Sequence, residues 1–156
     1  MGAVSAGICL WRINDDDQLE VLIVHPGGPF WANKDEGAWS FPKGEFDPGV
    51  EAGLDAARRE FAEELGHRAP QSGEAIELGE TKLKSGKRIL VWALQGDLDV
   101  DTVESNTFEM QWPPKSAKMQ RFPEVDRALW CDPATATAKL NPAQAVFIER
   151  LADHLG

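Results

Sequence analysis

The chain has 156 residues, of which 42% are hydrophobic and 27% charged, values that are ordinary for a soluble globular protein. Its length fits one domain with a single core, which we expect to span residues 1–156. The formal net charge of −10 argues against a nucleic acid polymer and an anionic membrane as partners, because both need a basic surface.

The first elements predicted along the chain are a β-hairpin and a long loop. Residues 4–13 and 19–25 are rich in β-branched and aromatic residues, and they flank the polar turn NDDDQ, which is typical of a hairpin. The Gly- and Pro-rich stretch that follows predicts a loop with one short strand near residues 39–41. Loops of this length in compact domains are more often functional than idle.

A helix follows this loop. Leu54, Ala57, Phe61 and Leu65 recur at helical spacing and predict an apolar stripe, and Gly66 supplies a C-terminal stop.

The second half of the chain predicts further strands and a second helix. Residues 75–96 indicate two strands joined by a tight turn at Ser85-Gly86, and residues 107–113 and 127–132 indicate two more. The segment NPAQAVFIERLADHL starts with an asparagine N-cap and a proline, which predicts an amphipathic helix. Several strands and two helices in irregular order predict an α+β fold with a mixed β-sheet.

Three glutamates, Glu60, Glu63 and Glu64, fall on an arc beside the apolar stripe of the first helix. Like charges at this spacing cost about 0.2–0.5 kcal/mol per pair, and Arg59 offsets part of that cost. One interpretation is a solvated charged face with salt bridges. The other is a hard divalent cation, Mg²⁺ or Mn²⁺, which the position at the core edge and the preceding loop favour.

The segment from Gly44 to Gly66 resembles the Nudix box, G-x5-E-x7-R-E-U-x-E-E-x-G-U, where U is a bulky apolar residue. The half REFAEELG matches at every fixed position. The front half departs from the pattern, because six residues and not five separate Gly44 from Glu51, with Val50 as the extra residue. His67 occupies the last apolar position.

This resemblance implies an α/β/α sandwich and the Mg²⁺- or Mn²⁺-dependent hydrolysis of a P–O–P bond in a nucleoside diphosphate-linked small molecule. It implies metal ligation by Glu60 and Glu64, with Glu63 as a further or water-mediated ligand and a backbone carbonyl near Gly44. The resemblance also implies that Arg59 orients the glutamates, and we therefore expect Glu63 and Arg59 to be catalytic residues.

The general base of such an enzyme is often a carboxylate outside the box. We assign this role to Glu109, which lies in a strand pattern after a loop, with Glu104 and Glu124 as rivals. A plain surface glutamate is the alternative for each.

Substrate contacts are expected from Lys43, Trp31, Trp39 and Glu51, which lie in or just before the box. Core packing is the alternative for both tryptophans. His25 is interpreted either as a phosphate contact or as a buried, hydrogen-bonded histidine. The chain has no tyrosine, which diadenosine polyphosphate hydrolases of the family usually carry, so the substrate stays open.

Two cysteines, Cys9 and Cys131, lie in apolar surroundings and predict buried, unreactive thiols. The N-terminal segment predicts neither a signal peptide nor a membrane span, so a cytoplasmic protein is expected. A homodimer is left open.

Two functional hypotheses remain. The first is a pyrophosphohydrolase with Mg²⁺ or Mn²⁺ as cofactor. The second is a catalytically reduced Nudix-fold nucleotide-binding or regulatory module, which the altered front half of the box would indicate.

Overall fold

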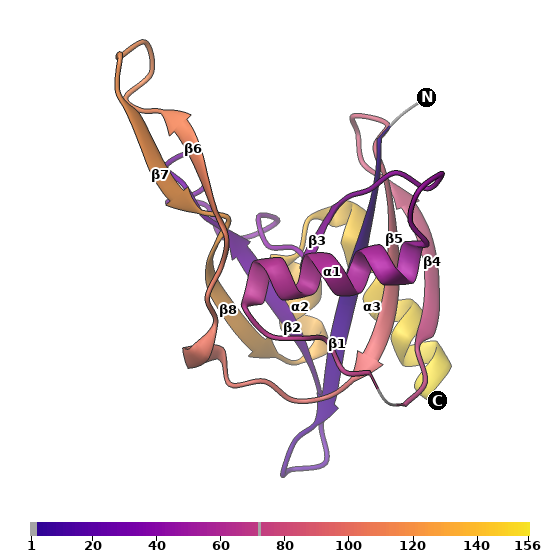
Figure 1. Cartoon of the computed structure of the whole chain (residues 1–156). Helices are drawn as coiled ribbons and strands as arrows, with labels where there is room; N and C mark the ends of the chain where they lie inside the picture. Colours follow the sequence, from indigo (N-terminus) through magenta and orange to yellow (C-terminus); the bar gives the residue numbers. More distant parts are fainter. Residues whose placement is uncertain (1–2, 72) are drawn as a thin grey trace.

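A computed structural model describes residues 3–71 and 73–156 (Figure 1). The strands are β1 (Val4–Ile13), β2 (Leu19–Pro26), β3 (Lys43–Glu45), β4 (Ile76–Lys82), β5 (Arg88–Gln95), β6 (Thr107–Gln111), β7 (Met119–Pro123) and β8 (Val125–Cys131). The helices are α1 (Gly53–Leu65), α2 (Pro133–Lys139), α3 (Pro142–Leu155) and the short 3-10 helix η1 (Val100–Thr102).

The main sheet is mixed, which confirms the predicted α+β class. Its strand order is β4-β5-β1-β2-β8, with β3 also paired to β1. Strands β1 and β5 run parallel, whereas the other pairs are antiparallel. The predicted hairpin is present as β1 and β2. Strand β1 is buried without interruption from Val4 to Leu10, as expected for a central strand that is covered on both faces.

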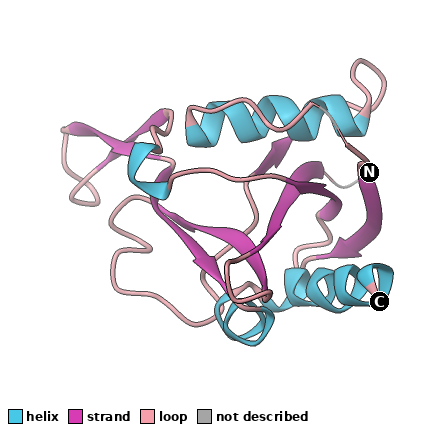
Figure 2. Cartoon of the chain, turned by 90° about the horizontal axis from the view of Figure 1, so that it is seen from below, coloured by secondary structure: helices cyan, strands magenta, loops and turns pink. Residues whose placement is uncertain are grey.

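Helices cover the sheet on both sides, which gives the expected sandwich of layers (Figure 2). Helix α1 buries Phe61 and Leu65 against one face of the sheet, where Leu22 points toward it. Helices α2 and α3 cover the opposite face, to which Ile23 contributes. Leu22 and Ile23 are neighbours in β2 but belong to hydrophobic clusters on opposite faces of the sheet, because successive side chains of a strand point to opposite faces.

Four elements differ from the prediction. Helix α2 was not expected, although Asp132 caps it and Pro133 opens it, because its seven residues are too few to show an apolar period. Strands β3 and β7 were also missed. The strand expected near residues 39–41 is reduced to isolated bridges, from Val24 to Ser40 and from Trp39 to Leu140.

Strands β6 and β7 form a separate two-stranded hairpin that projects from the body of the molecule (Figure 1). Phe108 and Phe122 are cross-strand partners on one face of this hairpin. Glu109 and Arg121 are partners on the other face.

Side-chain hydrogen bonds of His25 and Gln144 hold the long loop between β2 and β3 in place. His25 is fully buried, with Nδ1 2.8 Å from Asp126 and Nε2 2.6 Å from the Lys34 carbonyl. This is the buried-histidine interpretation, and it leaves the ring no free edge for a phosphate. Gln144 of α3 accepts the Phe41 N–H at 2.9 Å. These contacts of the loop therefore fix the position of β3.

Both cysteines are buried and free, as the sequence predicts. Burial raises the pKa of both thiols, that of Cys131 to about 12. None of the helices in the described part of the chain has the length and apolar composition that crossing a bilayer requires.

The α1 interface makes a first prediction. Phe61 is completely buried, so Phe61→Ala should lower the free energy of unfolding by about 3–5 kcal/mol through the cavity it leaves. Chemical denaturation measures this change. Met119→Ala is the control, because Met119 is 61% exposed and should change stability by less than about 0.5 kcal/mol. Equal losses in both variants would contradict the packing described here.

Candidate active site

The crowded glutamates of α1 are held by one guanidinium group. Arg59 donates to both carboxylate oxygens of Glu51 at 3.0 Å, to Glu60 at 3.0 Å and to Glu63 at 3.4 Å. The hydrogen bonds from Arg59 hold the pKa of Glu51 below its usual range. Much of the like-charge repulsion along the helix is therefore neutralised locally, and the side chains are oriented.

The extra residue of the box is absorbed before Glu51. The amides of Val50 and Glu51 both donate to the Asp47 carbonyl at 3.0 Å, and the Asp47 carboxylate accepts the Gly49 N–H at 2.9 Å. Val50 is thereby turned outward and is 83% exposed. Glu51 consequently keeps its pairing with Arg59 despite the insertion.

Glu60 and Glu64 are the carboxylates with the least access to water. Glu60 is only 9% exposed, and burial raises its pKa, with a further contribution from Glu63. Burial likewise raises the pKa of Glu64 to about 8. The Lys43 N–H donates to Glu64 at 3.3 Å, which is its one hydrogen bond from the backbone among the described residues. The nearby positive charges therefore do not fully offset the effect of burial on the pKa of either group.

The backbone at Gly44 lies directly against Glu60. A Cβ at this position would collide with the Glu60 carboxylate, so only glycine leaves room for it. Lys43, the residue before it, is half-buried beside Glu64, and burial lowers the pKa of its ammonium group. Strand β3 thus brings a cation and an open stretch of backbone to the glutamates of α1.

These residues fit a hard divalent cation. The donor set is made of carboxylate oxygens with incomplete charge compensation, which is the chemistry that Mg²⁺ and Mn²⁺ select. In the described residues no three acidic, histidine or cysteine side chains yet converge on one point.

A fourth carboxylate, Glu124, faces this group from outside the box. Its charge contributes to the raised pKa of both Glu60 and Glu64, after burial and the nearer charges. It lines a cavity of about 100 Å³ together with Lys43 and Glu64. The other residues around this cavity are Val24, Pro26, Ser40, Phe41 and Val125.

Glu109, the residue that the sequence favours as base, is not brought to this cavity. Its side chain is 58% exposed on the projecting hairpin and pairs with Arg121 at 3.3 Å. Of its rivals, Glu104 lies beyond the end of α1 and donates its N–H to the Leu65 carbonyl. Glu124 is therefore the better-placed base. The sequence signal for it was weak, since Glu124 only precedes a strand.

A larger and mainly apolar cavity of about 360 Å³ adjoins the acidic one. Pro26 and Glu124 line both cavities, so the two lie side by side. The remaining lining residues are Gly27, Gly28, Phe30, Trp31, Phe108 and Met110.

The expected substrate residues divide into two groups. Trp31 lines the apolar cavity, and Lys43 lines the acidic one. Trp39 instead belongs to the core: it is 3% exposed and donates its indole N–H to Asp35 at 2.7 Å. Both carboxylate oxygens of Glu51 accept hydrogen bonds from Arg59, so Glu51 is placed to orient the arginine and lines neither cavity.

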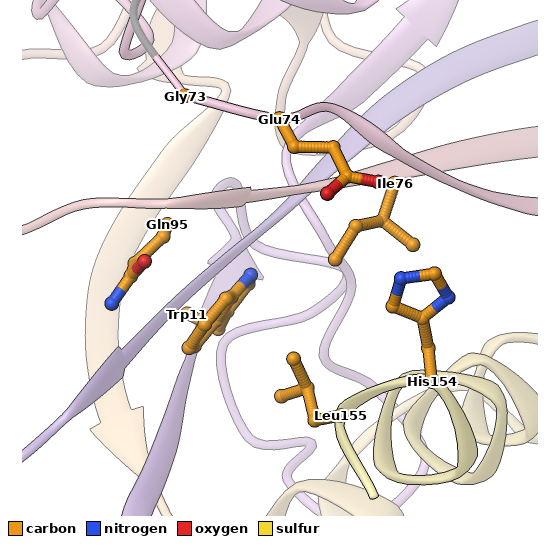
Figure 3. A pocket seen from close by; sticks show the side chains of 7 residues that line it. All are labelled: Trp11, Gly73, Glu74, Ile76, Gln95, His154 and Leu155. Atoms are coloured by element: carbon orange, nitrogen blue, oxygen red, sulfur yellow. The ribbon is translucent and has the colours of Figure 1, made fainter.

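A separate cavity of about 510 Å³ lies at the end of α3 (Figure 3). Trp11 and Gln95 bound it from the sheet, and His154 bounds it from the helix. It shares no lining residue with the acidic cavity and has a single carboxylate, Glu74. The glutamates of α1 therefore lie apart from this cavity.

Comparison with known proteins gives one family and a set of similar folds. The model of the NUDIX domain matches residues 3–151. An Ap4A hydrolase from C. elegans superposes with a TM-score of 0.64 and 21% identity, over 98% of this chain and 97% of that chain. The NUDIX domain of Shewanella oneidensis NrtR, solved with ADP ribose, gives 0.63 and 17%, over 100% and 90%. A MutT protein from Methanosarcina mazei gives 0.57 and 17%, over 98% and 94%.

The raised pKa of Glu64 predicts a pH-dependent effect on the metal-free protein. The folded state binds the Glu64 proton more tightly than the unfolded chain, so stability falls as pH rises from about 4.5 to about 8. Glu64→Gln removes this loss. The free energy of unfolding of the variant, relative to that of the parent protein, should therefore be about 1–3 kcal/mol higher at pH 9 than at pH 5. Denaturant unfolding in EDTA at both pH values measures this; a difference that is independent of pH contradicts it.

The glycine at position 44 predicts a specific loss of metal affinity. Gly44→Ala should weaken Mn²⁺ binding by about 10- to 100-fold, because the new Cβ displaces the Glu60 carboxylate. Calorimetric titration measures the affinity. Gly49→Ala is the control in the loop that follows β3, where the added Cβ meets only Asp47 at 3.3 Å, and it should bind Mn²⁺ like the parent protein. Unchanged affinity in both variants would remove Gly44 from the site.

Proposed function

Because this chain belongs to the NUDIX domain family, we propose that it is a Mg²⁺- or Mn²⁺-dependent pyrophosphohydrolase that cleaves a P–O–P bond in a nucleoside diphosphate-linked small molecule. Nudix hydrolases act on diphosphate bonds, so the reaction class follows from the family. The observation that carries the finer proposal is the acidic cavity, where Lys43, Glu64 and Glu124 meet beside the buried Glu60.

Glu60 and Glu64 would hold the metal, and Glu63 would complete the set directly or through water. A backbone carbonyl near Gly44 would add a further oxygen, as the resemblance of the box implies. When bound, the cation would neutralise phosphate charge and lower the pKa of a coordinated water. Arg59 would position Glu60 and Glu63 through its hydrogen bonds to them and need not touch the substrate.

Glu124 and Lys43 have complementary roles in this proposal. Glu124 is exposed at the rim of the cavity, opposite the glutamates of α1, where it can accept the proton of the attacking water. Lys43 lines the same cavity, where its ammonium group can meet a phosphate oxygen and stabilise the charge that develops on the transferring phosphoryl group.

Two neighbours indicate which substrates to test first. The C. elegans neighbour is an Ap4A hydrolase, and the Shewanella NUDIX domain was solved with ADP ribose. Dinucleoside polyphosphates and ADP-ribose therefore head the series, and nucleoside triphosphates and nucleotide sugars complete it. Action in the cytoplasm is part of the proposal, and assembly as a homodimer remains open.

The second candidate is a catalytically reduced nucleotide-binding or regulatory module. The insertion in the front half of the box is the observation that favours it. The insertion is weaker support than the sequence suggests, because Val50 turns outward and Glu51 still pairs with Arg59. Binding of a nucleotide without turnover would identify this alternative.

The proposal predicts different activities for variants of four glutamates. In a product-release assay with Mg²⁺ or Mn²⁺, Glu60→Gln and Glu64→Gln should lose activity by at least about 100-fold, because each removes a charged metal ligand. Glu124→Gln should lower kcat by about 10²- to 10⁴-fold, as expected for loss of a general base.

Glu109→Gln is the matched control for Glu124→Gln, and its activity should stay within twofold of the parent protein. The reverse order of these two variants would return the base to Glu109. Full activity of Glu64→Gln would refute the metal site. No turnover of any substrate by the parent protein, together with measurable nucleotide binding, would favour the regulatory module.

A further inference from the structure

We propose that His25 is a positioning residue for the hydrolysis: its ring, protonated on both nitrogens and paired with Asp126, holds the walls of the acidic cavity in place from behind. This inference rests on the proposed function, because it names what fixes Lys43 and Glu124 relative to each other. His25 itself is completely buried and lines neither cavity, so it acts through other residues and not on the substrate.

The acidic cavity is built from segments that are distant in sequence. Apart from Glu64 of α1, its lining residues are Val24 and Pro26 of β2, Ser40, Phe41 and Lys43 of the loop and β3, and Glu124 and Val125 at the start of β8. His25, Trp39 and Asp126 are the immediate chain neighbours of these segments. Because successive side chains of extended chain point to opposite sides, the three meet on the face away from the cavity. This group of His25, Trp39 and Asp126 is termed the clamp.

Both ring nitrogens of His25 face groups that accept hydrogen bonds. Nδ1 lies 2.8 Å from Oδ1 of Asp126, and Nε2 lies 2.6 Å from the carbonyl oxygen of Lys34. A neutral imidazole carries one N–H and can serve only one of these two acceptors. The two contacts are therefore both hydrogen bonds only when the ring carries two protons.

The Asp126 carboxylate is the counter-ion that a buried, charged ring needs. Its side chain is 32% exposed, and Nε of Arg127 lies 3.6 Å from it. Solvent and a neighbouring cation both favour the ionised carboxylate over a carboxyl group that would hold the shared proton itself. The proton is therefore assigned to the His25 ring, and the bond to Asp126 is charge-assisted and correspondingly strong.

The other charged groups of this region surround Trp39. Its ring contacts the His25 ring edge to face, with centroids 5.2 Å apart, and its indole N–H donates to Asp35 at 2.7 Å. Lys139 of α2 donates to the same carboxylate at 2.9 Å, and the Arg127 guanidinium of β8 lies 5.2 Å from the Trp39 ring centroid. Each carboxylate of this region thus lies beside a cation, and the clamp joins the loop to both β8 and α2.

The bond to Lys34 connects the clamp to the substrate side of the site. Lys34 lies in the middle of the loop between β2 and β3, and that loop ends at Lys43. Holding its midpoint limits how far the loop, and with it the Lys43 ammonium, can move relative to β8. Without the second ring proton, Nε2 would present a lone pair to the carbonyl oxygen, and this support would be lost.

Main-chain bonds carry the same support to the cavity wall. Val24 and Ser40 exchange N–H···O bonds of 2.8 and 2.9 Å, so the two residues that flank the clamp are tied directly to each other. On the other side, His25 is the Cα partner of Arg127, and Pro26 is the partner of Val125, next to Glu124. A shift at the clamp is therefore transmitted to both sides of the acidic cavity.

The ring protons test this inference without an activity assay. Nitrogen NMR of the full chain at pH 7 should show a proton on each ring nitrogen of His25. The chain has three histidines, and the exposed His67 and His154 are assigned by replacing each with glutamine. Asp126→Asn should leave one ring proton, because it removes the counter-ion. A single ring proton on His25 in the parent protein, or two that persist in Asp126→Asn, would overturn the inference.

Kinetics of the same variant test the positioning role. With the best substrate of the release assay, Asp126→Asn should lower kcat about tenfold and change KM less than about threefold, because small displacements of catalytic groups are costly in rate. His25→Gln should lower kcat at least as far, since its one donor nitrogen cannot reach acceptors on opposite sides of the ring. The double variant should match His25→Gln, because both residues act through one contact.

Matched controls carry the same chemical changes on the exposed side of α3. Asp153→Asn and His154→Gln should each keep kcat within about twofold of the parent protein, as expected for surface substitutions. A circular dichroism spectrum of each variant verifies that it is folded.

Failure of this inference is distinct from failure of the proposed function. Full activity of Asp126→Asn, or losses that add up in the double variant, would overturn the positioning role and leave the hydrolase intact. Absence of turnover of every diphosphate by the parent protein would refute the proposed function and the positioning role together. The doubly protonated ring would still be decided by NMR alone.

Discussion

Two carboxylates that water cannot fully solvate, those of Glu60 and Glu64, set the conditions for the rest of the site. Burial at the edge of the α1 core raises the pKa of both groups, and neither Lys43 nor Arg59 compensates this completely. Because a buried anion is costly without a partner, the arrangement favours any cation that can enter with oxygen coordination. The position of the glutamates beside Phe61 and Leu65 thus distinguishes them from the carboxylates of an exposed, charged helix face.

Arg59 offsets the like-charge repulsion that remains among the glutamates. Its guanidinium contacts Glu51, Glu60 and Glu63 at the same time, so the loop before α1 and the helix itself share one charge network. A single planar cation with several donors can do this, whereas a lysine could not hold the same fork. The insertion at Val50 is tolerated for the same reason, because the network depends on where Glu51 arrives and not on the path of the loop.

The sequence predicts the local parts of this structure well and the distant contacts poorly. The β1–β2 hairpin, α1 and α3 follow from apolar period and capping residues, which are properties of neighbouring positions. Helix α2 and strand β3 are too short to show a period. The arc of glutamates was visible, but Glu124 could not be separated from Glu109. That distinction depends on which face of a projecting hairpin turns inward. Trp31 and Trp39 were likewise equivalent in sequence, and only packing placed Trp39 in the core.

Backbone hydrogen bonds explain why Glu124, which is far from the box in sequence, faces it in space. The carbonyls of Glu63 and Leu65, at the end of α1, accept the N–H groups of Asn106 and Glu104. The Asn106 carbonyl accepts the Glu124 N–H at 2.8 Å, and the Glu124 carbonyl accepts the Gly27 N–H at 3.0 Å. One series of main-chain bonds therefore runs from the helix of the acidic residues, through Glu124, to the glycine loop of the apolar cavity. The distance between the two walls of the acidic cavity is consequently set by backbone and not by flexible side chains. Glu124 and Gly27 each line at least one of the two cavities, so both cavities share this main-chain support.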